Sequence, residues 1–116
     1  MRVEVEPGAL VEVATAVWRL GNKADRADRA DGDRTARYVR GVVDALVGAG
    51  VETRQYDGAA YDSGLRLRVL AFQQVPGLDR EEVIETVRPA VFLRGDLIGM
   101  GEVIVGTPPA EGERAE

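Results

Sequence analysis

The chain has 116 residues, which is enough for one domain with a modest core and too few for two. Apolar residues make up 45% of it and charged residues 30%, the balance of an ordinary globular protein. The formal net charge of −5 argues against a nucleic-acid partner, because phosphate binding requires a basic face. The apolar runs are far shorter than the roughly 20 residues of a membrane span, and the N-terminus lacks the apolar core of a signal peptide. We therefore expect a cytoplasmic protein with no membrane partner.

The residue types that most catalytic sites use are missing. The chain contains no cysteine and no histidine. These absences exclude a thiolate nucleophile, a disulfide framework and a cysteine-based zinc site, together with the side chain most often used for proton transfer near neutral pH. The single serine, Ser63, has no imidazole to activate it. We expect no catalytic residue, no metal ion and no cofactor, so the sequence predicts a protein that is not an enzyme.

Two helices are predicted in the first half of the chain. From Leu10 onward, apolar residues recur in alternating steps of three and four, the spacing of a helix that packs against a partner helix. Gly21-Asn22 interrupts this series and predicts a kink or a weak point, and Asp31-Gly32-Asp33 ends the first helix. The second helix is expected over about residues 34–49, with Gly50 at the C′ position that stops it.

Each helix carries an apolar stripe that is wider than one neighbour of the same length can cover. A helical hairpin of this kind commonly pairs with a second copy of itself, so we expect a homodimer. Trp18 lies one step off the stripe and is expected to pack within the helices rather than to anchor a partner. The predicted dimer interface consists of Leu10, Val13, Val17, Leu20, Val39, Val43 and Leu46.

After Gly50 the apolar pattern changes to a period of two, which predicts strands. The stretches "VETRQY" and "LRLRVLAFQQV" alternate, and "VIETVRPAVFL" and "LIGMGEVIV" follow as two strands joined by a tight hairpin at Arg94-Gly95-Asp96. Pro89 is expected at an edge or a bulge, and the glycines around position 100 are expected to permit twist or a bulge between strands. The predicted fold is α+β: a lead-in over residues 1–9, an antiparallel helical hairpin over 10–50, a small antiparallel β domain over 51–106 and a disordered tail over 107–116.

The hairpin region contains three short motifs that have functional meanings in other proteins. Arg94-Gly95-Asp96 spells an adhesion tripeptide, but adhesion needs a secreted protein, and a hairpin turn needs polar residues around a glycine anyway. Gly99-Met100-Gly101 resembles the start of a kinase glycine loop, yet the third glycine is absent and the chain is too short for the other kinase parts. Asp96 and Glu102 would lie about 20 Å apart along a strand, which is too far for paired acid–base work. None of the three is expected to carry the function.

A helix ending "VVDALVGAGVE" is followed by a short strand, a "YDG…YD" stretch, a strand "RVLAFQQV", a loop and "VIETVRPAVFLRGDLIGMGEVIVG". This order resembles the head region of the GrpE nucleotide exchange factors of DnaK-type chaperones. The resemblance covers about residues 10 to 106, and its matching positions are Tyr61-Asp62, Gly95, Ile98, Val103 and Val105. The chain departs from the family at the turn proline, which is Ser63 here, and after the hairpin glycine, where Asp96 replaces a basic residue. It would be a minimal, divergent relative that lacks the family's long N-terminal helix pair.

The resemblance implies a homodimer whose β domain binds the ATPase domain of a DnaK-type chaperone and holds its nucleotide cleft open, so that ADP leaves faster. This activity requires no catalytic residue, only a surface that binds the open state better than the closed one. The contact positions that the resemblance implies are Tyr61, Val87, Asp96 and Val105. We add Arg94 and Met100, because exposed arginine and methionine are enriched at interfaces.

Other interpretations remain open at this point. Val87 and Val105 fit a β core as well as a contact, and Arg94 and Asp96 fit a solvated turn. The same fold can also serve as an adaptor that docks a chaperone-like ATPase without releasing its nucleotide. A small enzyme that uses carboxylates around Tyr56 and Tyr61 would require a pocket with a carboxylate of strongly raised pKa, and no cluster in the sequence suggests one.

Overall fold

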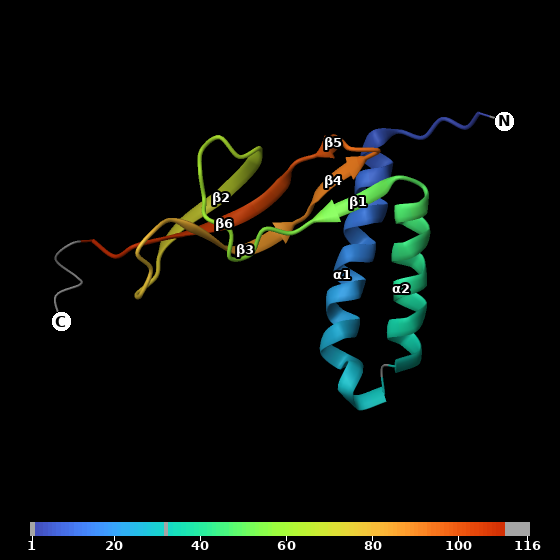
Figure 1. The fold of residues 1–116 in the computed structure, drawn as a ribbon, viewed down its shortest axis with the longest axis horizontal. Coiled ribbons are helices and arrows are strands. Elements are labelled where there is room, and N and C mark those ends of the chain that lie inside the picture. The colour runs from blue at the N-terminus through green and yellow to red at the C-terminus, as the bar shows by residue number, and fades with distance from the viewer. Residues whose placement is uncertain (1, 32, 111–116) are drawn as a thin grey trace. The chain divides into compact units, whose positions relative to one another are not determined.

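Two helices are followed by six short strands (Figure 1). The computed structural model describes residues 2–31 and 33–110, without the side chains of residues 25–33. The elements are α1 (Pro7–Asp31), α2 (Asp33–Gly48), β1 (Val51–Arg54), β2 (Leu67–Gln74), β3 (Glu82–Arg88), β4 (Ala90–Leu93), β5 (Asp96–Gly99) and β6 (Gly101–Thr107). The strands form two sheets of three, in the orders β1-β4-β5 and β2-β6-β3. The predicted α+β class with an N-terminal helical hairpin is confirmed. None of the described helices has the length and apolarity needed to cross a membrane.

The chain divides into two compact units that are interleaved in sequence. The first, here called the helical unit, comprises residues 1–53 and 91–99 and holds both helices with the sheet β1-β4-β5. The second, here called the sheet unit, comprises residues 54–90 and 100–116 and holds the sheet β2-β6-β3. These units do not coincide with a division near residue 50, because the β4–β5 hairpin packs with the helices, where α1 contacts β5.

The first helix differs from its prediction at its start and in its middle. It begins at Pro7 rather than near Leu10, because proline has no N–H to lose in a first turn and its fixed φ suits a helix. It continues through Gly21-Asn22 as one element, so the predicted kink or weak point does not end the helix there. A Cβ on Gly21 would lie 3.7 Å from Cγ1 of Val39, which shows that this glycine lies against α2.

The end of α2 is attached to the β4–β5 hairpin. Gly50 has a φ of 91°, which confirms its predicted place as the left-handed residue after the helix. The backbone N–H of Arg94 donates a hydrogen bond to the carbonyl of Gly50 at 2.7 Å. The core of the helical unit lies nearby and is built from Ala14, Val51 and Val91, with Leu10, Val11, Leu46, Leu93 and Ile98 packed around them.

In the sheet unit, β6 is the central strand. It pairs antiparallel with β3 but parallel with β2, so the prediction of a wholly antiparallel domain is wrong. Alternation along a strand indicates which face is buried and does not indicate the direction of the neighbour. One face of the sheet carries the buried residues Leu67, Val83, Val103 and Val105, against which Tyr56, Tyr61 and Leu65 pack.

The loop between β1 and β2 is fixed to β3 by hydrogen bonds. The N–H of Gly58 donates to the carbonyl of Val83 at 2.8 Å, and the N–H of Tyr61 donates to the carbonyl of Glu81 at 2.9 Å. The Thr86 hydroxyl donates to the Asp57 carboxylate and accepts from the N–H of Tyr56 at 3.0 Å. These bonds hold the two tyrosines of the loop over the sheet.

Each of the last two predicted strands is divided into two. Pro89 separates β3 from β4, and Met100 separates β5 from β6, so the chain passes from one sheet to the other at these two residues. Pro89 is fully buried and follows β3, an outer strand of its sheet whose register shifts just before it, between Thr86 and Arg88. It has no N–H with which to continue a ladder. Of the predicted tail, residue 107 ends β6, and residues 111–116 lie outside the described part of the chain.

Candidate functional site

The helical hairpin exposes part of its apolar surface. Three of the seven predicted interface residues are exposed: Val13 at 51%, Leu20 at 50% and Val43 at 39%. Leu10, Val17 and Leu46 are half-buried. Val39 is only 7% exposed and belongs to the core of the single chain, because it faces Gly21 of α1. Two further valines of α2, Val42 and Val47, are also exposed.

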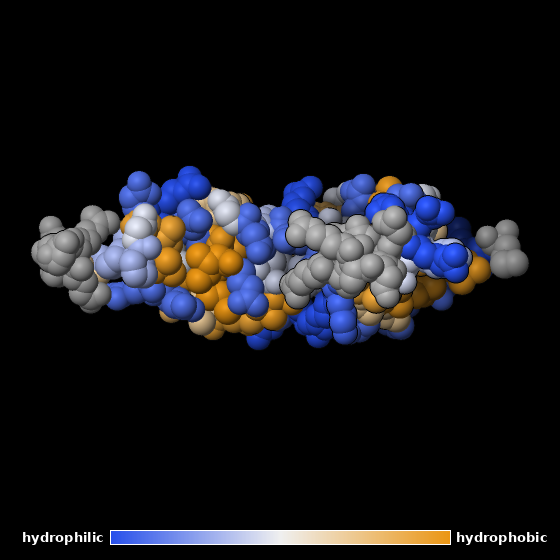
Figure 2. All heavy atoms as spheres, turned by 90° about the horizontal axis from the view of Figure 1, so that it is seen from below, coloured by the Kyte–Doolittle hydropathy of each residue, from blue (hydrophilic) through white to orange (hydrophobic). Residues whose placement is uncertain are grey.

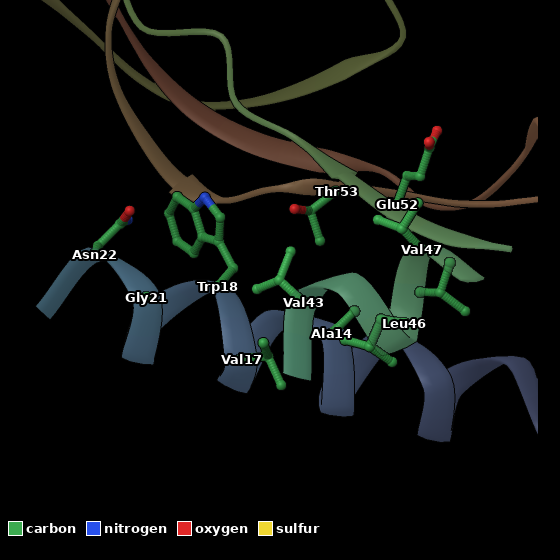
Figure 3. Close-up of a pocket in the computed structure, with 11 residues that line it drawn as sticks. Ala14, Val17, Trp18, Gly21, Asn22, Val43, Leu46, Val47, Glu52 and Thr53 are labelled. Carbon is green, nitrogen blue, oxygen red and sulfur yellow. The ribbon is translucent and has the colours of Figure 1, made fainter. Parts of the chain in front are cut away.

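A groove of about 460 Å³ lies among α1, α2 and β1 (Figure 3). Its walls are mostly apolar, and Trp18 is the only aromatic residue among them. Glu52 and Thr53 contribute polar groups from β1, the strand that opposes the helices across the groove. The remaining lining residues are Ala14, Val17, Gly21, Asn22, Val43, Leu46, Val47 and Val51. Sequence reasoning missed this groove, and the only signal for it was a tryptophan displaced from the main stripe.

The β4–β5 hairpin presents Arg94 and Asp96. Arg94 and Gly95 have φ values of 50° and 88°, and Leu93 pairs with Asp96, so the two residues form a two-residue turn with both φ values positive. The predicted hairpin is therefore confirmed. Both charged side chains are exposed. The stem of Arg94 lies over Gly50, where an added Cβ would be 2.8 Å from its Cγ.

The other predicted contact residues belong to the sheet unit. Met100 is 48% exposed, while Val87 and Tyr61 are half-buried. The Tyr61 ring packs edge-on against Phe72, with centroids 6.1 Å apart. Val105 is completely buried, so the alternative of a core position holds for it and the contact prediction is wrong. The predicted contact residues are thus divided between the two units.

The second face of the sheet unit carries a charged row across three strands. Glu102 of β6 has Arg68 of β2 and Arg88 of β3 on either side, each with a nitrogen–oxygen distance of 3.9 Å. Exposed pairs at this distance contribute little to stability. Apolar surface also lies over this unit, visible on the left of Figure 2. On β2, Leu70 and Phe72 are exposed.

The described part of the chain exposes apolar and charged side chains on both units. Among the residues whose side chains the structure describes, 2–24 and 34–110, no three acidic side chains are grouped so that they could hold a metal ion. Neither a protein-family model nor a curated protein matches the chain. The candidate site is therefore a set of exposed surfaces: the helical stripe with its groove, the β4–β5 hairpin and Met100.

Proposed function

We propose that the protein is a GrpE-like nucleotide exchange factor, a co-chaperone that binds the ATPase domain of a DnaK-type chaperone and promotes ADP release. The observation that carries the proposal is the order of the elements: a helical hairpin, a short strand, a tyrosine-bearing loop, an alternating strand, and a hairpin at Arg94-Gly95. The resemblance of the sequence implies this order.

The β4–β5 hairpin suits an activity that depends on shape rather than on chemistry. An exchange factor shifts its partner toward an open state only by its differential affinity for that state. A rigid contact surface serves this purpose, because little conformational freedom is lost on binding. The two-residue turn and the bond from Arg94 to Gly50 hold the hairpin, and they leave the side chains of Arg94 and Asp96 exposed.

We also propose that the protein is a homodimer built on the exposed stripe of α1 and α2. Complete burial of a valine or leucine side chain contributes about 1.5–3 kcal/mol, so covering the half that is still exposed contributes roughly 1 kcal/mol for each side chain. Summed over two copies, this is comparable with the cost of association, which is about 4–15 kcal/mol. The residues that supply this area are Val13, Leu20, Val42, Val43 and Val47.

The test is release of a fluorescent ADP analogue from the DnaK-type chaperones of the same organism, with and without this protein. In the test variant, Arg94→Asn and Asp96→Asn remove both charges, and asparagine tolerates the positive φ of residue 94. The matched control is Asp79→Asn with Arg80→Asn, because these residues are also an exposed acid and arginine and lie on the loop before β3. We expect the wild type and the control to accelerate release and the hairpin variant to lose most of the acceleration.

Other outcomes select between the alternatives. Binding to the ATPase domain without acceleration would favour the adaptor. Absence of both binding and acceleration, with every such chaperone tried, would refute the proposal. If the hairpin variant accelerates release as much as the wild type, the protein is an exchange factor but Arg94 and Asp96 do not form its contact with the chaperone.

A further inference from the structure

The outer side of β2 is an open sheet edge. β6 lies on one side of β2, and no other strand in the described part of the chain pairs with its opposite side. Arg68 and residues 70–74 are exposed. The strand contains neither lysine nor proline, residues that commonly block an edge against further pairing. A bulge at Leu70 interrupts the register, so the longest regular stretch of open backbone is residues 71–74.

The two faces of β2 differ in chemistry. Val69 and Phe72 are paired with Val103 and Val105, so they lie on the apolar face of the sheet. Arg68 is paired with Glu102 and lies on the opposite face, as does Gln73 beyond the bulge. An additional strand on this edge must therefore place apolar side chains on one face and acidic or polar ones on the other.

Residues 2–6, here called the arm, have this pattern. Their sequence, "RVEVE", alternates valine with charged residues, as in a half-buried strand. The arm has no regular secondary structure, and Val3 and Val5 are 71% and 52% exposed. It is thus a strand-like sequence that pairs with no sheet in a single copy of the chain.

We propose that the arm of one copy adds as an antiparallel strand to the β2 edge of a second copy. Val3 and Val5 would then cover Val69 and Phe72, and Glu6 would lie beside Arg68. The antiparallel direction keeps the arm beside β2, which begins at Leu67. A parallel arm with Glu4 beside Arg68 would bring Arg2 toward Arg66. A parallel arm with Glu6 beside Arg68 would place residues 2–4 beside residues 64–66, which precede the strand. Both segments are unpaired within one copy, and an exchange between two copies pairs them.

Charge also favours β2 over the other sheet edges. The outer strands β1, β3 and β5 all carry acidic residues, which would repel Glu4 and Glu6 of the arm. Only β2 carries an arginine and no acidic residue. The acidic residues of the other edges are Glu52, Glu82, Glu85 and Asp96.

Directed cross-linking tests the proposal, because the natural chain has no cysteine. One full-length variant carries Arg2→Cys, and a second, with a tag of different mass, carries Gln73→Cys, so that Glu4, Glu6 and Arg68 remain intact. After mixing and mild oxidation, we expect a mixed disulfide dimer of the two tagged chains. The matched control replaces Gln73→Cys by Thr53→Cys, an exposed position on the β1 edge, and should cross-link at least several-fold more slowly.

Further variants separate the arm from any contact between helices. Glu4→Lys with Glu6→Lys should reduce the rate of cross-linking between positions 2 and 73 to that of the control at position 53. Raising the salt concentration should also slow cross-linking between positions 2 and 73, because screening weakens exposed charge pairs. Both glutamates are exposed, so the variant is expected to fold. Equal rates for positions 73 and 53, or a rate that charge reversal does not alter, would overturn the proposal. A third variant carries both Arg2→Cys and Gln73→Cys in one chain. If it forms a disulfide within the chain in preference to one between two chains, the proposed exchange between copies is wrong. These outcomes do not depend on the chaperone partner.

Discussion

Gly50 joins the end of α2 to the β4–β5 hairpin, and alanine at this position should destabilise the protein through two separable effects. The first is the backbone, because a φ of 91° is in the left-handed region, where a Cβ costs about 1–2 kcal/mol. The second is contact, because the new Cβ would lie 2.8 Å from Cγ of Arg94 and 3.7 Å from its backbone nitrogen. Relieving such overcrowding typically costs about 1–3 kcal/mol. We expect Gly50→Ala to lower the free energy of unfolding by about 2–5 kcal/mol.

A matched control isolates the contact. Gly95 has a nearly identical φ of 88°, and an added Cβ there would have no neighbour within 4 Å. Gly95→Ala therefore carries the backbone cost alone, about 1–2 kcal/mol. Urea unfolding followed by the fluorescence of Trp18, the only tryptophan in the chain, reports on the unit that contains both glycines.

The difference between the two variants decides the argument. We expect Gly50→Ala to lose about 1–3 kcal/mol more than Gly95→Ala, and Arg94→Ala to recover part of that excess in a double-mutant cycle. Losses that agree within about 0.5 kcal/mol would refute the contact with Arg94 as a source of destabilisation. A cycle with no coupling energy would refute it independently.

Three further changes follow from local packing. Gly41→Ala should stabilise the protein by about 0.5–1 kcal/mol in thermal unfolding, because Gly41 is an exposed residue in the middle of α2 and a Cβ there meets nothing within 4 Å. An unchanged stability would contradict this expectation. Thr15→Val should stabilise it by about 1 kcal/mol in urea, because Thr15 is 1% exposed and its hydroxyl has no hydrogen-bond partner among the described residues. A loss of stability would show that the hydroxyl is bonded. Gly106→Ala should lower the free energy of unfolding in urea by about 1–3 kcal/mol, because the added Cβ would lie 2.6 Å from Cγ2 of Ile84 and 2.8 Å from Cδ1 of Leu78. An unchanged free energy would show that both side chains can move.

The helices could be predicted from the sequence because their periodicity extends over many residues. The steps of three and four from Leu10 identify α1, and the positive φ of Gly50 was predictable from its place after α2. The spacing does not indicate how much of each stripe the neighbouring helix covers. Val39 and Val43 are one turn apart on α2, yet the first is buried against α1 and the second is exposed.

The strands were predictable in existence but not in arrangement. Alternation and the Arg94-Gly95 dipeptide located the hairpin, whereas the parallel pairing of β2 with β6 depends on contacts between distant parts of the chain. The glycines near position 100 were interpreted as permitting twist or a bulge, and the pairing of β4 with β5 does shift its register beside Gly99. The sequence did not show that two of these glycines also permit a close approach. A Cβ on Gly99 would lie 2.8 Å from Cγ2 of Val11, and one on Gly101 would lie 3.1 Å from the nitrogen of Ala90. The groove beside Trp18 depends on how β1 returns over the helices, which no local pattern encodes.

The β4–β5 hairpin is tied to the helices more closely than its position in the sequence suggests. Arg94 is bonded to Gly50 at the end of α2, and Gly99 at the end of β5 lies against Val11 of α1. Both ends of β5 are thus held near the helices, within one compact unit. If the exposed stripe of the helices forms a dimer, a change in that interface acts on the same unit that carries Arg94 and Asp96. Loss of exchange activity in a helix variant would therefore not by itself place the chaperone contact on the helices, because the hairpin can be displaced without any direct contact being removed.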